Sequence, residues 1–432
     1  MTTHVLLVLV HCLALVVFIN RYVAGVFLRF VRGDNWDETT DDFEPTVTAV
    51  IPMFNEGRAI QETLRSLLDQ AYPADKLRII CVDDCSSDDS FEIAREIART
   101  SNGRLRVIRN RSNLGKRRSI IRATRMTDSE IILSVDSDVV VDKNAVAEIV
   151  RRFTEPRIAA VGGWVDIRNK HDNWLTRMQV IKYWYGYYFL KNLEWGFRRV
   201  MCLSGCLTAY RRSVLVELEP VLEKRSIFGV PIKYGEDRFL TRQIIKAGYL
   251  TTMTLAARCR TFVPNTLPSY FSQQLRWRRS NIVDYAGAFS HVWRLNPVLA
   301  IHFFAQFALI LGYPVAVVRA LASGWFFPAL QIHIGAVAAF GLYYRWRVRK
   351  RPPEERVGAL SFIPLSLLMP ITYALLTPLA LFTLDSGSWE TRDHHDINEQ
   401  PVGAVDNGTG PLPALVPIEA APARSHAQLP AA

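Results

Sequence analysis

Long apolar stretches flank a central block of short apolar runs in this chain. The long stretches lie at residues 5–28, 298–322, 325–344 and 360–384. A helix needs about 20 predominantly apolar residues to cross a bilayer. The pattern therefore predicts an N-terminal transmembrane helix at 5–28 and three C-terminal transmembrane segments within 298–384. The last one contains Pro364, Pro370 and Pro378, so a re-entrant or broken helix is the alternative there.

Basic residues beside these stretches predict the orientation in the membrane. Arg21, Arg29 and Arg32 accompany the end of the first stretch, and the run 345–351 between the last two is almost wholly basic. Cytoplasmic loops carry an excess of Lys and Arg. We expect a multi-pass protein of the plasma membrane, with the domain between the spans in the cytosol and the C-terminus outside.

Residues 45–265 alternate between strand-like and helix-like patterns. Apolar runs at 46–52, 77–82, 105–108 and 131–135 are separated by segments with helical spacing, at 58–70, from 87 to about 98, and at 116–125. Strands that alternate with helices argue a parallel sheet of the α/β class. The run at 131–135 is apolar almost throughout, as expected of a central strand covered on both faces.

Two carboxylates follow that central run. Asp136 and Asp138 are two residues apart, and side chains at this spacing along a strand point to the same side. Ligands of open α/β sheets bind beyond the carboxyl ends of the strands. A pair of oxygen donors there suits Mg²⁺ or Mn²⁺ bridging to substrate phosphates. A solvated Asp-Ser-Asp turn is the alternative interpretation.

More acidic residues end the second strand, where Asp83 and Asp84 follow an apolar run. The chain has no P-loop, since Asn110 stands where the first glycine would be, and no G-x-G-x-x-G after the first strand. Carboxylates with a metal and a cation such as Lys116 suggest a nucleoside diphosphate carrying a transferable group. Capping of the following helix is the alternative for Asp83 and Asp84.

Asp237 stands in a Gly-Glu-Asp-Arg segment just before a helical run at 239–247. It is a candidate general base, and the alternative is an ordinary acidic complement to a helix start.

Residues 266–297 have the pattern of amphipathic helices at a membrane interface. Phe271, Leu275 and Ile282 share one face, and arginines lie on the other. Within this segment, Arg276 is a candidate to bind a diphosphate and Trp277 to stack on a sugar. The alternative is an interfacial helix with no role in chemistry.

Composition narrows the class of protein further. The formal net charge of +11 has its basic residues next to apolar segments, which favours an anionic membrane surface over nucleic acid. The six cysteines form no CxxC pair, so we expect reduced thiols and neither a disulfide framework nor a zinc site. Residues 401–432 are rich in Pro, Ala and Gly, and we expect this tail to be disordered.

Taken in order, these motifs resemble the family 2 membrane glycosyltransferases. The likeness is nearest to the hyaluronan synthases and the nodulation chitin-oligosaccharide synthases, and it runs from about residue 46 to the Trp-Glu-Thr-Arg at 389–392. The motifs that carry it are Val82-Asp83-Asp84, Gly115-Lys116-Arg117, Asp136-Ser137-Asp138, Ser204-Gly205, Gly235-Glu236-Asp237-Arg238 and the Gln-x-x-Arg-Trp of Gln273, Arg276 and Trp277.

The resemblance implies a glycosyltransferase-A fold, a Rossmann-like nucleotide-diphospho-sugar transferase domain. It also implies the role of each motif. Asp83 and Asp84 would hold the uridine, Lys116 the nucleotide, Asp136 and Asp138 the Mg²⁺ (or Mn²⁺) on the UDP diphosphate, and Asp237 would deprotonate the acceptor. Gln273, Arg276 and Trp277 would line the acceptor and diphosphate site, with Ser204, Gly205, Glu236 and Arg238 also near the acceptor.

The activity implied is that of a processive inverting β-glycosyltransferase. Our leading expectation is a hyaluronan synthase-like enzyme that uses UDP-N-acetylglucosamine with UDP-glucuronic acid and exports the growing polysaccharide through the lipid membrane. The alternatives are a chitin-oligosaccharide synthase and transfer of one sugar to a polyprenyl lipid. Cys206 and Val139 depart from the usual family residues, Pro and Thr. Glu236 leans towards the chitin-oligosaccharide enzymes, whereas the 389–392 segment leans towards hyaluronan synthases. The sequence leaves the oligomeric state open.

Overall fold

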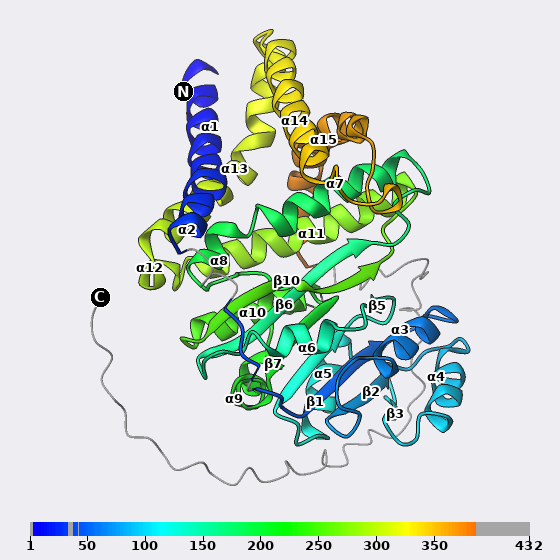
Figure 1. Ribbon diagram of the computed structural model, residues 1–432. Coiled ribbons are helices and arrows are strands. Elements are labelled where there is room, and N and C mark those ends of the chain that lie inside the picture. Colours follow the sequence, from blue (N-terminus) through cyan, green and yellow to red (C-terminus); the bar gives the residue numbers. More distant parts are fainter. Residues whose placement is uncertain (1–2, 33–37, 42, 228, 233, 386–432) are drawn as a thin grey trace.

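The molecule consists of a sheet-containing domain and a set of apolar helices stacked on one side of it (Figure 1). The computed structural model describes residues 3–32, 38–41, 43–227, 229–232 and 234–385. The predicted disordered tail and the 389–392 segment lie outside the described residues.

One large mixed sheet forms the centre of the domain. Its strand order is β3-β2-β1-β4-β7-β6-β10-β5. These strands are β1 (Val47–Met53), β2 (Leu77–Asp83), β3 (Leu105–Arg109), β4 (Ile131–Val135), β5 (Val140–Val141), β6 (Ile158–Ile167), β7 (Leu207–Arg211) and β10 (Leu250–Thr261). The short β8 (Ser226–Ile227) and β9 (Val230–Pro231) pair separately.

The predicted strands form the parallel half of this sheet. β1 pairs in parallel with both β2 and β4, and β2 pairs in parallel with β3. The other half was not foreseen from the sequence: β7 runs antiparallel to β4 and β6, and β10 pairs in parallel with β6. The predicted α/β class with a glycosyltransferase-A arrangement is confirmed.

Helices cover both faces of the sheet, which explains the unbroken apolar runs. Ile51 and Leu133 belong to the core on one face, with Leu64, while Val50 and Ile132 belong to the core on the other face. A strand buried on both faces has no polar side to show. The helices of the domain are α3 (Ala59–Leu68), α4 (Ser90–Arg99), α5 (Lys116–Arg125), α6 (Ala145–Val150), α7 (Trp174–Tyr188), α8 (Asn192–Gly196), α9 (Arg212–Leu222) and α10 (Glu236–Lys246).

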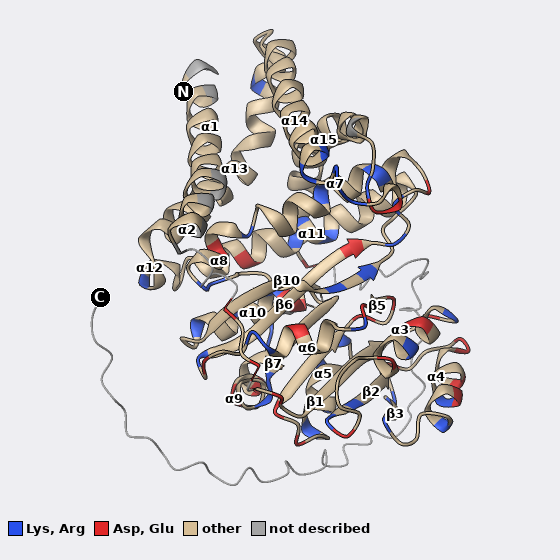
Figure 2. Ribbon diagram, in the orientation of Figure 1, with Lys and Arg blue, Asp and Glu red and all other residues tan. Residues whose placement is uncertain are grey.

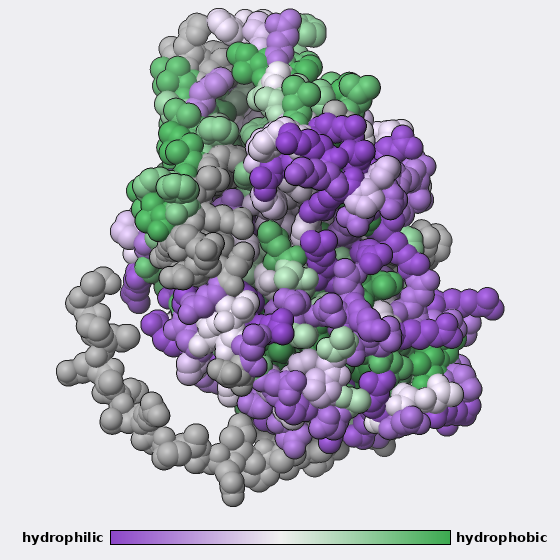
Figure 3. All heavy atoms as spheres, in the orientation of Figure 1, coloured by the Kyte–Doolittle hydropathy of each residue, from purple (hydrophilic) through white to green (hydrophobic). Residues whose placement is uncertain are grey.

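The apolar helices include three that could cross a membrane. They are α13 (Pro297–Ala322), α14 (Phe326–Arg347) and α15 (Phe362–Leu381), and each has the required length and hydropathy. Charged side chains are sparse in this layer and gather where it meets the sheet domain (Figure 2). The view in Figure 3 shows the same division, with hydrophobic atoms above and hydrophilic atoms below.

The N-terminal segment is helical but not uniform. α1 (Thr3–Phe18) continues through a π-helical turn at Ile19–Ala24 into α2 (Gly25–Arg32). α1 packs against α13, and α2 packs against α8 of the sheet domain. The predicted N-terminal span stays a prediction, which the packing against α13 supports.

α11 (Leu267–Ala288) lies between the sheet domain and the apolar helices, and the short α12 (Val292–Leu295) follows it. The face of α11 that was predicted to carry arginines does not point into water. Arg278 and Arg279 are only 7% and 8% exposed. Arg278 lies 3.7 Å from the ring centroid of Tyr373 in α15, and Arg279 Nε donates to Thr383 Oγ1 over 3.0 Å. α15 remains one helix across Pro370 and Pro378, and short 3₁₀ turns at Pro353–Glu355 and Ala359–Ser361 precede it.

Candidate active site

The candidate residues meet at one edge of the sheet, because β1, β2 and β4 are parallel and end there. Asp83 is the last residue of β2 and pairs with Met53 at the end of β1. Asp136 directly follows β4 on the other side of β1. This edge is where ligands of such sheets bind.

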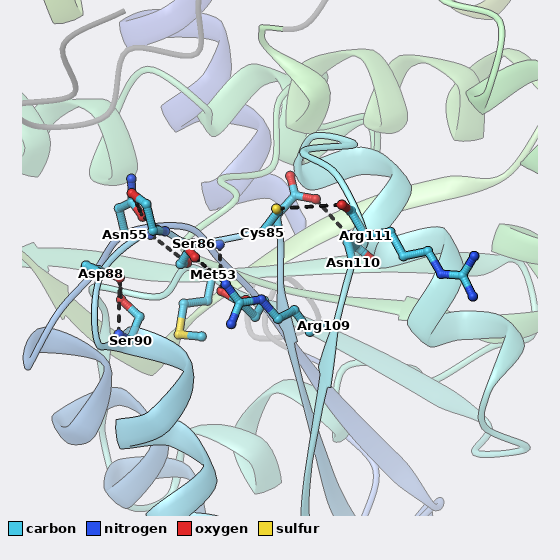
Figure 4. Close-up of polar contacts among 12 residues, drawn as sticks. Met53, Asn55, Cys85, Ser86, Asp88, Ser90, Arg109, Asn110 and Arg111 are labelled. Carbon is cyan, nitrogen blue, oxygen red and sulfur yellow. Dashed lines mark hydrogen bonds and ion pairs between the residues drawn. The ribbon is translucent and has the colours of Figure 1, made fainter. Parts of the chain in front are cut away.

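Asp83 is fully buried, and it contacts Ser86 and Arg109, which belong to the polar cluster shown in Figure 4. Arg109 Nε is 3.1 Å from its Oδ2, and the Ser86 amide donates to its Oδ1 over 3.3 Å. Burial raises the pKa of the Asp83 carboxyl, and the contacts with Ser86 and Arg109 offset this only in part. Asp83 therefore gains a proton more readily than an ordinary Asp.

Two residues of this cluster adopt left-handed backbone conformations that sequence reasoning missed. Asn55 has φ of 51° and Cys85 has φ of 69°, each just beyond the end of a strand. The Asn55 amide donates to Ser86 Oγ over 2.9 Å, and its side-chain oxygen accepts from the Ser87 amide over 2.8 Å (Figure 4). Such conformations persist where the surroundings over-determine them, often at functional sites.

The carboxylate of Asp84 is used for hydrogen bonds to other residues of the protein. Its carboxylate accepts from Asn110 Nδ2 and from the amides of Leu114 and Gly115, at 2.7, 2.8 and 2.7 Å respectively. These bonds hold the turn immediately before α5, which begins at Lys116. The structure thus assigns Asp84 a role in placing Lys116, and its contact with uridine stays a prediction.

We call the edge of the sheet that carries Asp83 and Asp136 the donor edge. Lys116 connects this edge to the start of α10, which is acidic. Its ammonium is paired with Asp136 Oδ1 and lies 3.8 Å from Glu236 Oε1. Burial opposes its charge, but Asp136 and Glu236 outweigh this and raise the pKa of Lys116 above its ordinary range. A Cβ on Gly205 would lie 2.5 Å from the Lys116 Nζ, so only glycine leaves room for this arrangement.

Asp136 and Asp138 fit one divalent cation when a substrate completes its coordination. Thr261 Oγ1 donates to Asp138 Oδ2 over 3.1 Å and orients that carboxylate. In the described part of the chain, no group of three or more His, Cys, Asp or Glu side chains could hold a metal. Two carboxylates suit Mg²⁺ or Mn²⁺, since such sites usually rely on water and substrate phosphates for the remaining ligands.

Asp237 lies in the first turn of α10, after Gly235 with its positive φ of 65°. Its Oδ2 accepts from the Gly205 amide over 3.3 Å, and its Oδ1 accepts from the Arg238 amide over 2.8 Å. A cavity of about 20 Å³ is lined by Lys116, Gly205, Glu236 and Asp237 among others. The structure therefore brings together the predicted Lys, Ser-Gly and Gly-Glu-Asp-Arg motifs.

The Gln-x-x-Arg-Trp motif occupies α11. The Trp277 ring lies 6.3 Å from Tyr183 and 5.2 Å from Lys182 Nζ, both on α7, and these two neighbours were not foreseen from the sequence. Gln273 Oε1 accepts from Gln274. Half-buried Arg276 forms no ion pair with any described residue.

Carboxylates at this edge of the sheet and at the start of α10 are the arrangement expected of a glycosyltransferase that uses a nucleotide-linked sugar. Comparison with known proteins agrees. The model of the family described as "Glycosyl transferase family 2" matches residues 48–218. The chain belongs to this family, and it is a hexosyltransferase.

Curated relatives extend the likeness over most of the chain. An N-acetylglucosaminyltransferase of Bradyrhizobium diazoefficiens is 32% identical over 366 residues, covering 83% of this chain and 74% of the relative. Those of Mesorhizobium japonicum and Rhizobium meliloti are 30% and 32% identical, and cover 87% and 83% of this chain and 88% and 83% of their own. The resemblance to family 2 membrane glycosyltransferases is thus confirmed.

A solved structure shares the fold at lower identity. The mannosyltransferase PcManGT from Pyrobaculum calidifontis, in complex with GDP-Man and Mn²⁺, superposes with a TM-score of 0.56 at 20% identity. The match covers 88% of this chain and 97% of that one.

Proposed function

We propose that this protein is a membrane N-acetylglucosaminyltransferase of the chitin-oligosaccharide synthase type, which transfers N-acetylglucosamine from UDP-N-acetylglucosamine to a growing sugar chain. The observation that carries the proposal is the placement of Asp237 beside Gly205 and Lys116 at the donor edge, in a chain whose relatives are named N-acetylglucosaminyltransferases. Those names favour this alternative over the leading expectation of a hyaluronan synthase that also uses UDP-glucuronic acid.

On the donor side, Asp83 accepts the N–H of the uracil ring, and Lys116 and Arg276 bind the diphosphate. Arg276 suits this role because its guanidinium is not engaged by a described acid. Asp136 and Asp138 hold Mg²⁺ or Mn²⁺, which when bound neutralises charge on the leaving UDP. Asp84 keeps Lys116 in place through the turn before α5.

On the acceptor side, Asp237 takes the proton from the attacking hydroxyl as the new glycosidic bond forms. The Gly205 amide steadies its carboxylate, so one oxygen is oriented before the acceptor arrives. Trp277 supplies a ring face for the sugar, with Ser204, Glu236, Arg238 and Gln273 nearby in the motifs that surround it.

The membrane helices would anchor the enzyme in the plasma membrane and pass the product outwards. We place the cytosolic domain at 45–265, the interfacial helices at 266–297, the N-terminal span at 5–28 and the C-terminal segments at 298–384. The three long apolar helices and the basic side chains at their lower boundary support this arrangement (Figure 2).

The test uses the purified full chain in lipid with Mg²⁺ and radiolabelled UDP-N-acetylglucosamine, with and without UDP-glucuronic acid, and sizes the product. We expect oligosaccharides from the single donor, unchanged by the second. A long polymer made only with both donors would show a hyaluronan synthase instead. Transfer of one sugar to an added polyprenyl phosphate would show a lipid glycosyltransferase.

A further inference from the structure

Lys182 of α7 places its ammonium between two aromatic rings of α11. Nζ lies 5.2 Å from the ring centroid of Trp277 and 5.7 Å from that of Tyr270. The same nitrogen donates to the side-chain oxygen of Gln274. Residues 270, 274 and 277 lie on one face of a helix because they are spaced by four and three positions. Lys182 therefore covers the face of α11 that carries Trp277.

No carboxylate of the described residues balances this charge. Burial, with a smaller contribution from Arg278, lowers the pKa of Lys182 to about 7, and no acid counteracts them. Lys116 and Lys170, whose side chains are each 9% exposed, are paired with Asp136 and Asp166. An ammonium that is crowded by protein but lacks a counter-charge is costly unless something else satisfies it.

Lys182 also ends a line of side chains that starts at the proposed catalytic acid. Gly205 donates to Asp237, and its neighbour Ser204 lies near the hydroxyl of Tyr187. Tyr187 and Tyr183 lie one turn apart on α7, with ring centroids 6.5 Å apart, and Tyr183 lies 6.3 Å from Trp277.

The part of this line beyond Gly205 stays accessible. Tyr187, Tyr183, Trp277, Gln274 and Lys182 are all partly exposed. By contrast, the buried cluster of Leu175, Met178 and Tyr270 packs against Leu365 and Leu368 of α15. Lys182 thus lies where the accessible line meets the apolar helices.

We propose that Lys182 and Gln274 form a further binding subsite for the sugar chain, beyond Trp277, which takes an oxygen acceptor of a neutral N-acetylated sugar. This inference rests on the proposed function. The aromatic rings offer faces for the sugar ring, while the ammonium and the amide meet its hydroxyl or N-acetyl carbonyl oxygens.

The subsite is tested by calorimetric titration of the purified full chain in lipid with chitotriose. We expect Lys182→Met to weaken chitotriose binding by about 10- to 100-fold, as loss of a hydrogen bond from a charged group. UDP affinity should be unchanged. Lys170→Met is the matched control, since it removes a lysine that is paired with Asp166 and should leave chitotriose binding intact.

A purely structural lysine would behave differently in two further measurements. The melting temperature of Lys182→Met should stay close to that of the wild type, because the variant loses the bond to Gln274 and two ring contacts but no ion pair with a described residue. Wild-type affinity for chitotriose should fall as the pH rises through about 7, where the ammonium loses its proton, and the Lys182→Met profile should be flat. The other titratable groups around the site are Arg278 and Tyr270 on α11 and Tyr373 on α15, and burial raises the pKa of Tyr270 to about 12.

The outcomes separate this inference from the proposed function. Turnover of UDP-N-acetylglucosamine by the wild type, with equal chitotriose binding in Lys182→Met or with no chitotriose binding at all, would overturn the subsite alone. Tighter wild-type binding of a hyaluronan tetrasaccharide than of chitotriose would overturn the neutral-sugar assignment. A wild type that neither turns over UDP-N-acetylglucosamine nor binds chitotriose would refute both.

Discussion

Asp284 of α11 and Arg242 of α10 form a buried ion pair, with Arg242 Nε 3.0 Å from Asp284 Oδ1. Arg225 Nη2 contacts the second carboxylate oxygen at 3.1 Å. The two helices also meet directly, since a Cβ on Gly235 would lie 2.0 Å from Ser280 Oγ. The helix whose first turn contains Asp237 and the helix that carries Trp277 are therefore fixed to each other.

Replacing Asp284 by Ala should destabilise the protein by about 3–5 kcal/mol, because two arginines lose their buried partner. Thermal unfolding of the purified protein in lipid measures this effect. The control is Glu96→Ala, which breaks the exposed pair with Arg99 and should cost no more than about 1 kcal/mol. Equal melting temperatures for the two variants would show that Asp284 does not hold the helices together.

Asp237→Asn should lower turnover by about 10²–10⁴-fold, as expected when a general base is removed. The affinity for UDP should survive, because Asp237 contacts the Gly205 amide and not the predicted uridine or metal residues. Steady-state sugar transfer and UDP titration separate the two quantities. Glu92→Gln, at an exposed helix start, serves as the control, and full turnover in Asp237→Asn would rule out the assignment.

Gly205→Ala should raise the KM for the donor by about tenfold or more, because the new methyl group displaces Lys116 from Asp136. Initial rates at varied donor concentration provide the measurement. Gly186→Ala is the matched control, as its Cβ would meet nothing within 4 Å. If both variants keep the wild-type KM, Lys116 does not depend on the space at Gly205.

Asp138→Asn should weaken UDP binding in the presence of Mg²⁺ or Mn²⁺, while binding in a chelator should match that of the wild type. The reason is that one of only two candidate carboxylate ligands is lost. Asp142→Asn removes a nearby acid that instead pairs with Arg260, and it should leave metal-dependent binding unchanged. An unaltered metal dependence in Asp138→Asn would exclude Asp138 as a ligand.

The raised pKa of Asp83 predicts how UDP binding depends on pH. Only the carboxylate form accepts the uracil N–H, and it is lost below the pKa. Acidification should therefore weaken UDP binding at a pH above the usual Asp value of about 3.9. Asp83→Asn should bind UDP more weakly, with a flat profile over the same range. A wild-type profile that tracks an ordinary Asp, or one shared by Asp83→Asn, would contradict the role.

Much of the parallel half of the sheet was predictable from the sequence because its strands are mostly apolar and polar residues follow them. The observed β1, β2, β3 and β4 fall within a residue or two of the predicted runs. β7 and β10 escaped prediction since their pairing is set by tertiary contacts: β7 inserts antiparallel between β4 and β6 although it is far from both in the chain.

The residues of the site divide in the same way, into those found from short sequence motifs and those whose role depends on contacts between distant parts of the chain. Motifs whose residues are adjacent in the chain, such as Asp136-Ser137-Asp138, could be recognised from the sequence. Lys182 and Tyr183 did not, because their significance comes only from packing beside Trp277, far along the chain. The internal role of Asp84 was likewise not predictable from the sequence, since two of its three partners are backbone amides, which almost any residue could supply.

The bond from Thr261 to Asp138 has a mechanical consequence. Thr261 is the last residue of β10, and only residues 262–266 separate it from the start of α11. Any shift of Asp138 on binding the proposed metal would therefore reach the helix bearing Trp277 through a connection of five residues. The proposed donor side and the proposed acceptor side of the site are thus joined by one short stretch of backbone.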